Sequence, residues 1–231
     1  MKTLSSFFAY DGDLRSGVRV AAGPLQRVGR DFIVTAPGPG GGPEVRVYDG
    51  QQTINRPIAV PVLSFFAADS TLTDGVYVST GNLRGDGRHD IITGSGSGVG
   101  VVRVFDGRTG GFLREFGVPI DEVPTGGGTA SGPGNFSFQT PINGSLLSPT
   151  LVPSALVPVA AGRDPGIGLV RGGVSVAAVD WDGDGLDDIV TGNGPGNAPR
   201  VRVFNTRTQL EITSILAYSP TFLGGVNVAA D

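Results

Sequence analysis

The sequence predicts an all-β fold, namely a β-propeller built from four-stranded blades that forms part of a ring. Of the 231 residues, 39 are Gly and 17 are Pro, yet 39% are hydrophobic, so many turns separate segments with enough apolar surface for a core. No stretch of ten or more residues has the apolar spacing of an amphipathic helix. Short β-prone segments also recur along the chain, and four strands in about 50 to 60 residues are typical of a propeller blade.

The recurrence is visible in short motifs. Ser-Phe-Phe-Ala at residues 6–9 returns at residues 64–67. Gly-Val-x-Val at residues 17–20 returns at residues 75–78, 173–176 and 225–228. We therefore expect three full copies of one unit and the beginning of a fourth.

Each copy predicts four strands in order. The first segment is aromatic or apolar, the second alternates with period two, the third is a short continuous apolar run, and the fourth begins with Val-Arg-Val before an aromatic residue. In the first copy these are residues 6–10, 18–20, 32–34 and 45–48; in the second, 63–67, 76–78, 91–92 and 102–105. The third copy supplies 174–176, 189–190 and 201–204, and the fourth 215–218 and 226–228.

These segments predict the boundaries of the units. The units are repeat 1 (4–62), repeat 2 (63–117), an insertion rich in Gly, Ser and Pro (118–157), repeat 3 (158–210) and the start of repeat 4 (211–231). We expect the insertion to decorate the surface. Because propellers close with about four to eight blades, further blades from a longer chain or a second copy are expected to complete the ring.

Composition argues against several function classes. Cysteine is absent and His89 is the only histidine, so thiol chemistry and two-histidine metal sites are excluded. A net charge of −4 without a basic run argues against nucleic acid as a partner, and no segment approaches the ~18 apolar residues of a membrane span. The first residues do not form a signal peptide. The sequence contains no matched acid and base that would suggest an active site, so we expect no enzyme activity.

The turn between the second and third strands of the third copy predicts a calcium site. It reads Asp-Trp-Asp-Gly-Asp-Gly-Leu-Asp-Asp over residues 180–188. Alternate carboxylates converge in a tightly wound loop, and six to eight hard oxygen ligands suit Ca²⁺ better than Mg²⁺. The predicted ligands are the carboxylates of Asp180, Asp182, Asp184 and Asp188 and the main-chain carbonyl of Leu186. The alternative is a solvated acidic turn without a metal.

The corresponding loops of the other copies have lost ligands. In the second copy Asn82, Asp86 and Asp90 keep oxygen atoms at three positions, but Arg84 replaces the second Asp. Its guanidinium must either lie where the cation would lie or turn outward, so a second metal site remains open. In the first copy only Asp31 is left, and we expect no metal there. His89 is expected to be an exposed loop residue.

The Asp-rich loop followed by Ile-Val, a Gly/Pro loop and Val-Arg-Val-Phe resembles the FG-GAP / VCBS repeat family, most closely from Gly173 to Asn205. The resemblance covers most of the chain except the insertion. It implies an integrin-α-type propeller with calcium in the Asp-rich loops, at the cell surface or outside the cell. The expected function is a non-catalytic calcium-binding module for adhesion or ligand binding, with a protein or glycan as partner. The alternative is an accessory or catalytic part of a secreted polysaccharide-degrading enzyme.

Two other features have alternative interpretations. Arg46, Arg103 and Arg202 each precede an aromatic residue by two positions, which predicts stacking of the guanidinium on that ring or recognition of an anionic glycan. Trp181, inside the acidic loop, is expected to pack on its neighbours or to contact a sugar.

Overall fold

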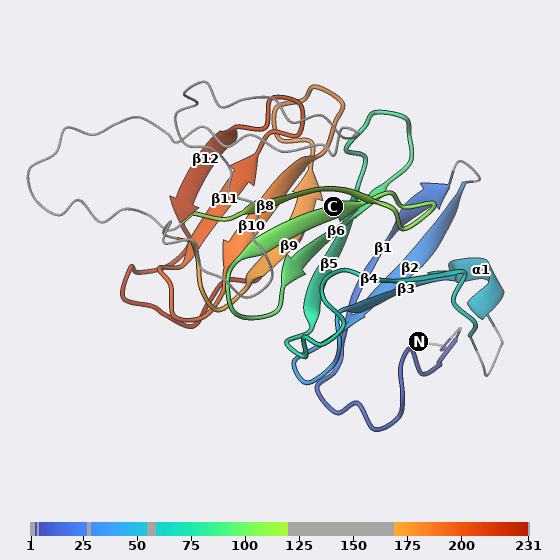
Figure 1. The fold of residues 1–231 in the computed structure, drawn as a ribbon. Helices are drawn as coiled ribbons and strands as arrows, with labels where there is room; N and C mark the ends of the chain where they lie inside the picture. Colours follow the sequence, from blue (N-terminus) through green and yellow to red (C-terminus); the bar gives the residue numbers. More distant parts are fainter. Residues whose placement is uncertain (1–2, 4, 27–28, 55–58, 120–168, 231) are drawn as a thin grey trace, which may run out of the picture.

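The computed structural model describes residues 3, 5–26, 29–54, 59–119 and 169–230, which form three four-stranded antiparallel sheets (Figure 1). The first sheet contains β1 (Val18–Gln26), β2 (Arg30–Pro37), β3 (Glu44–Asp49) and β4 (Leu63–Phe66). The second contains β5 (Val76–Gly81), β6 (Asp90–Ser95), β7 (Val101–Phe105) and β8 (Phe112–Gly117). The third contains β9 (Val174–Val179), β10 (Asp188–Asn193), β11 (Arg200–Phe204) and β12 (Glu211–Leu216). The only helix among these residues is one turn, α1 (Gly50–Thr53), so the all-β prediction is confirmed.

The same row of cross-strand neighbours occurs in all three sheets. In the first sheet, Val20 on the first strand faces Thr35 on the second, which faces Arg46 on the third. The matching rows are Val78, Thr93 and Arg103 in the second sheet and Val176, Thr191 and Arg202 in the third. Residues that match in the sequence copies therefore hold matching places in the three sheets.

The sheets and the sequence copies are out of phase by one strand. Leu63–Phe66, which opens the second copy, pairs with β3 and completes the first sheet. Residues 6–10, the expected first strand, are not in a strand, although Tyr10 donates its hydroxyl to the carbonyls of Thr35 and Glu44. The expectation that one copy forms one sheet is therefore wrong. A sequence period does not specify which of its strands begins a sheet, because that depends on backbone pairing.

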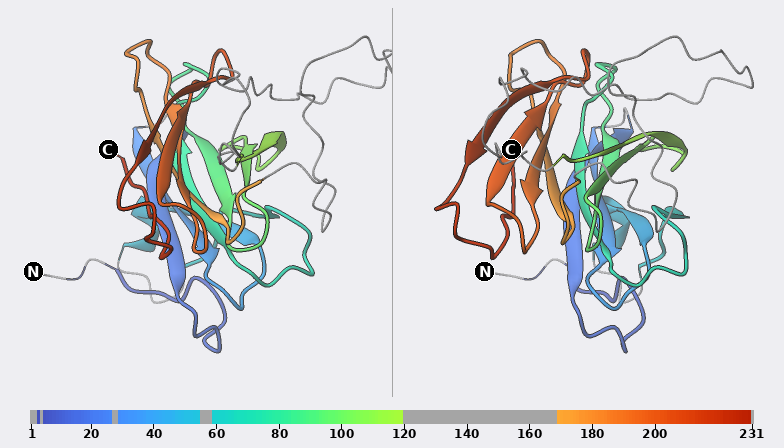
Figure 2. Two further views of the ribbon diagram at one scale, coloured as in Figure 1. Left: turned by 90° about the vertical axis from the view of Figure 1, so that its left-hand side faces the viewer. Right: turned by 60° about the vertical axis from the view of Figure 1, so that its left-hand side comes forward.

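The middle sheet lies between the other two, as Figures 1 and 2 show, and it buries both faces. Ile91 lies in the apolar cluster shared with the first sheet, and its neighbour Ile92 in the cluster shared with the third. Side chains of adjacent strand residues point to opposite faces, which explains the continuous apolar run in β6. Arg19 on β1 also stacks over the ring of Tyr77 on β5, with the guanidinium carbon 3.6 Å from the ring centroid.

Glycine allows the second and third sheets to approach closely. A Cβ atom added to Gly94 on β6 would lie 2.1 Å from the carbonyl oxygen of Val174 on β9. Beyond the third sheet, Val226 and Val228 lie against β9 and β10: the N–H of Val226 donates to the carbonyl of Asn193 at 2.9 Å, and the N–H of Val228 donates to the Ser175 hydroxyl at 3.3 Å.

Most of the predicted insertion lies outside the described residues. Pro119 and Leu169, which flank residues 120–168, form an antiparallel bridge. No helix in the described part of the chain is long and apolar enough to cross a membrane.

Candidate metal centre

The acidic loop lies between the end of β9 and the start of β10. Its backbone turns sharply at Gly183 and Gly185, which have φ angles of +77° and +86°. Side chains disfavour this left-handed region, so both positions favour glycine. The sharp turns place Asp180, Asp182 and Asp184 on one exposed loop.

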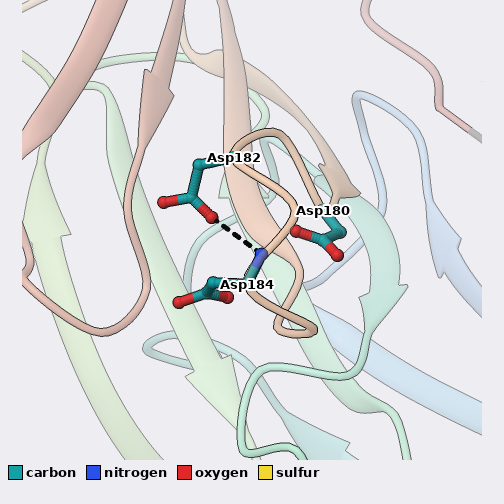
Figure 3. Close-up of side chains that lie close together, drawn as sticks. All are labelled: Asp180, Asp182 and Asp184. Carbon is teal, nitrogen blue, oxygen red and sulfur yellow. Dashed lines mark hydrogen bonds between the residues drawn. The ribbon is translucent and has the colours of Figure 1, made fainter.

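The three carboxylates converge, as Figure 3 shows. One oxygen from each of Asp180, Asp182 and Asp184 lies within 4.8 Å of the other two. The carboxylates also hold the loop: Asp180 accepts hydrogen bonds from the N–H groups of Gly183 (2.8 Å) and Gly185 (3.1 Å), and Asp184 accepts one from Leu186 (2.9 Å). The cluster could hold a metal ion, and its all-oxygen ligands favour a hard cation.

The fourth predicted carboxylate, Asp188, lies buried at the base of the loop. Its oxygens accept hydrogen bonds from the N–H groups of Thr206 (3.0 Å) and Trp181 (3.3 Å). Burial raises the pKa of Asp188 above its usual value, and the charges of Asp182 and Asp184 add to this increase. Excess negative charge of this kind is what a bound cation would neutralise.

Residues that follow β11 also contact the loop, and the sequence analysis did not find them. The side-chain amide of Asn205 donates to Asp182 at 2.7 Å, and the Arg207 guanidinium donates to Asp184 at 3.0 Å. Asn205 could have been singled out in the sequence because it directly follows Val-Arg-Val-Phe. Only the pairing of the strands shows that this position faces the acidic loop.

The second loop has left-handed glycines at the same two positions as the acidic loop, but its side chains make different contacts. Gly85 and Gly87 have φ angles of +69° and +73°, like the two glycines of the acidic loop. Arg84 points inward and donates to both oxygens of Asp90, at 2.9 and 2.6 Å, and to Asp106 at 2.8 Å. Asp86 instead pairs with Arg88. Asp86 and Asp90 therefore each pair with a different arginine.

The described residues of the first sheet show neither arrangement. Phe32 is in the place of Asp90, and Arg30 pairs with Asp49 at 3.1 Å. Asp31 is exposed.

The second and third loops are in direct contact. The N–H of Asn82 donates to the Asp187 carboxylate at 2.6 Å, and the N–H of Asp187 donates to the carbonyl of Asn82 at 3.1 Å. The first and second loops are joined similarly, because the N–H of His89 donates to the carbonyl of Pro24 at 3.0 Å. His89 is therefore half-buried at a sheet boundary and not an exposed loop residue.

The recurring arginines of the third strands form ion pairs. Arg103 pairs with Glu115 at 2.8 Å, Arg202 with Glu211 at 3.2 Å and Arg46 with Glu44 at 2.8 Å. Arg46 additionally lies over the ring of Tyr10, at 4.8 Å, rather than over the ring two residues further along its strand. The Trp181 residue is 55% exposed.

Comparison of the chain with models of known protein families found no match, and comparison with curated proteins found none either. The candidate site is therefore defined by its geometry.

Proposed function

We propose that the acidic loop binds one Ca²⁺ ion and that the chain is a calcium-stabilised, non-catalytic β-propeller module of the FG-GAP / VCBS type. The observation that carries this proposal is the convergence of Asp180, Asp182 and Asp184 on one exposed loop. Asp188 at the loop base and the carbonyl of Leu186 are the further ligands we assign. Seven or so oxygen atoms, some from water, would complete a calcium shell.

We further propose that the module acts outside the cell, where it mediates adhesion or binds a protein or glycan. Calcium is abundant there, and extracellular calcium modules bind the ion with dissociation constants of about 0.1–1 mM. The loop contacts the second sheet through Asn82, so bound calcium would stabilise the boundary between two sheets. Blades beyond the three described sheets, from a longer chain or a second copy, would complete a propeller ring.

Thermal unfolding in EDTA and in 10 mM Ca²⁺ tests the metal site. At 10 mM, calcium is present at about 10–100 times the assumed dissociation constant, which stabilises the folded state by about 1.4–2.7 kcal/mol and raises Tm by roughly 3–10 °C for a chain of this size. Asp184→Ala should abolish this increase. Asp13→Ala is the matched control, because the Asp13 side chain is 98% exposed and remote from the loop, and it should keep the full increase. If wild-type Tm is the same in both buffers, the loop is an acidic turn and the calcium proposal is wrong.

The binding role needs a separate experiment. The immobilised chain is exposed to anionic and neutral polysaccharides, with calcium and with EDTA, and both bound material and released reducing ends are measured. We expect calcium-dependent retention without release of product. Release of reducing ends that Asp184→Ala abolishes would refute the non-catalytic assignment.

A further inference from the structure

Matching residues of the second and third loops differ in charge. Arg84 of the second loop occupies the place of Asp182 in the third, and both side chains contact the first residue after the third strand of their sheet. That residue is Asp106 for Arg84 and Asn205 for Asp182. A positive side chain thus faces a carboxylate in one loop, and a carboxylate faces a neutral donor in the other.

The Arg84 guanidinium lies among the oxygens that a metal ion would need. It binds both oxygens of Asp90, which corresponds to Asp188 and is likewise fully buried at the start of its strand. It bridges Asp90 to Asp106, with N–O distances between 2.6 and 2.9 Å. A buried charge is strongly destabilising unless it is paired, and Arg84 supplies Asp90 with two charged hydrogen bonds, in addition to the backbone N–H of Gly107.

The rest of the second loop still has the form of a metal loop. Its glycines at residues 85 and 87 adopt the same left-handed conformation as residues 183 and 185. The Asp86 carboxylate accepts a hydrogen bond from the N–H of Arg88 at 3.0 Å, as Asp184 does from Leu186. The side-chain oxygen of Asn82 is buried and has no hydrogen-bond partner among the described residues. The second loop thus keeps the glycine turns and the oxygen atoms of a metal loop, and the positive group beside these oxygens is the Arg84 guanidinium.

We infer that the Arg84 guanidinium takes the place of the metal ion in the second loop, and that this loop becomes a calcium site when Arg84 is replaced by Asp. The second loop is then a metal loop with a built-in cation, which keeps its shape without calcium. Of these two loops, only the acidic one is then left to bind an ion in the natural chain. This inference rests on the proposed calcium site, because the third loop supplies the comparison.

The test measures calcium binding by calorimetry and by Tm in a chain whose third loop is disabled by Asp182→Asn and Asp184→Asn. In this background we expect no calcium response, because Arg84 fills the second loop. Adding Arg84→Asp lowers Tm in EDTA by roughly 5 °C or more, since Asp90 loses both hydrogen bonds from Arg84 and faces a new negative charge, and millimolar calcium restores it with one ion bound. Arg84→Lys, which keeps a cation, should remain insensitive to calcium.

Arg88→Ala is the matched control within the same loop. It removes the other guanidinium and leaves Arg84 on Asp90, so it should create no calcium response. Arg84→Gln covers the case in which Arg84→Asp does not fold, because it loses the charge without adding a carboxylate, and its Tm should also rise with calcium. Calcium binding by the disabled background, or folded Arg84→Asp and Arg84→Gln variants that bind none, would overturn the inference.

The two proposals fail separately. Absence of calcium binding by the otherwise unmodified chain refutes the acidic-loop site. The Arg84→Asp result in the disabled background decides the second loop, whatever the wild-type result is.

Discussion

Replacing Gly94 by Ala should separate the second sheet from the third. The added Cβ atom would lie 2.1 Å from the backbone carbonyl oxygen of Val174, whereas ordinary contacts begin near 3.4 Å. The obstacle is backbone and cannot rotate away, so β9 must move by about 1 Å, and with it the fully buried Val174. Overpacking of this kind costs about 1–3 kcal/mol, and the upper half of that range lowers Tm by roughly 4–12 °C.

Gly12→Ala is the matched control for this prediction. No atom lies within 4 Å of a Cβ added at Gly12, and its φ angle is outside the left-handed region, so its Tm should stay within about 2 °C of wild type. Both variants are compared by thermal unfolding monitored by circular dichroism, in EDTA so that calcium plays no part. If Gly94→Ala unfolds at the same temperature as Gly12→Ala, the close approach of the two sheets is not a constraint and the packing argument is wrong.

Three further predictions concern charge and the loop. Burial raises the pKa of Asp106, but hydrogen bonds from Arg84 and from the backbone of Thr109 outweigh this and hold the pKa below its usual value. The stability that Asp106 contributes is therefore present above about pH 4 and lost as the pH falls through its folded-state pKa. In urea unfolding, the free energy of unfolding of Asp106→Asn should depend less on pH than that of the wild type between about pH 2 and pH 4. Burial raises the pKa of the Tyr10 hydroxyl, so its contribution to stability is present below about pH 10 and is lost as the pH rises through the folded-state pKa. Burial also raises the pKa of Tyr48, so in absorbance titrations of the folded protein Tyr10→Phe should remove one tyrosine that ionises at raised pH and leave that of Tyr48. Trp181 is the only tryptophan, so the tryptophan fluorescence of the protein should change as calcium is added, over the same concentrations that raise Tm. An unchanged spectrum at saturating calcium would contradict binding at this loop.

The order of strands along the chain followed from local chemistry. Alternating valines predicted β1, β5 and β9, the continuous pair Ile91-Ile92 predicted β6, and Val-Arg-Val before an aromatic residue predicted the third strand of each sheet. The acidic loop was equally visible, because spacing of two between carboxylates and a glycine after the third of them are local properties. The convergence of Asp180, Asp182 and Asp184 agrees with that spacing.

Contacts between distant segments could not be predicted in the same way. The sequence left open whether Arg84 points into its loop or out of it, because its partner Asp106 is 22 residues away and reaches it only through the pairing of β6 with β7. The link between Asn82 and Asp187 spans 105 residues and depends on how two sheets pack.

The sequence by itself determined the β character of the chain, the places of most of its strands and the cluster of carboxylates, since each depends on residues a few positions apart. It did not predict β8, and the strand expected at residues 6–10 does not form. The tertiary structure decided that Leu63–Phe66 belongs to the first sheet and that Arg84 of the second loop binds the buried Asp90. The physical reason is the same for both. Hydrogen-bonded strand pairing and side-chain burial are set by whichever segments meet in space, and local sequence does not specify that meeting.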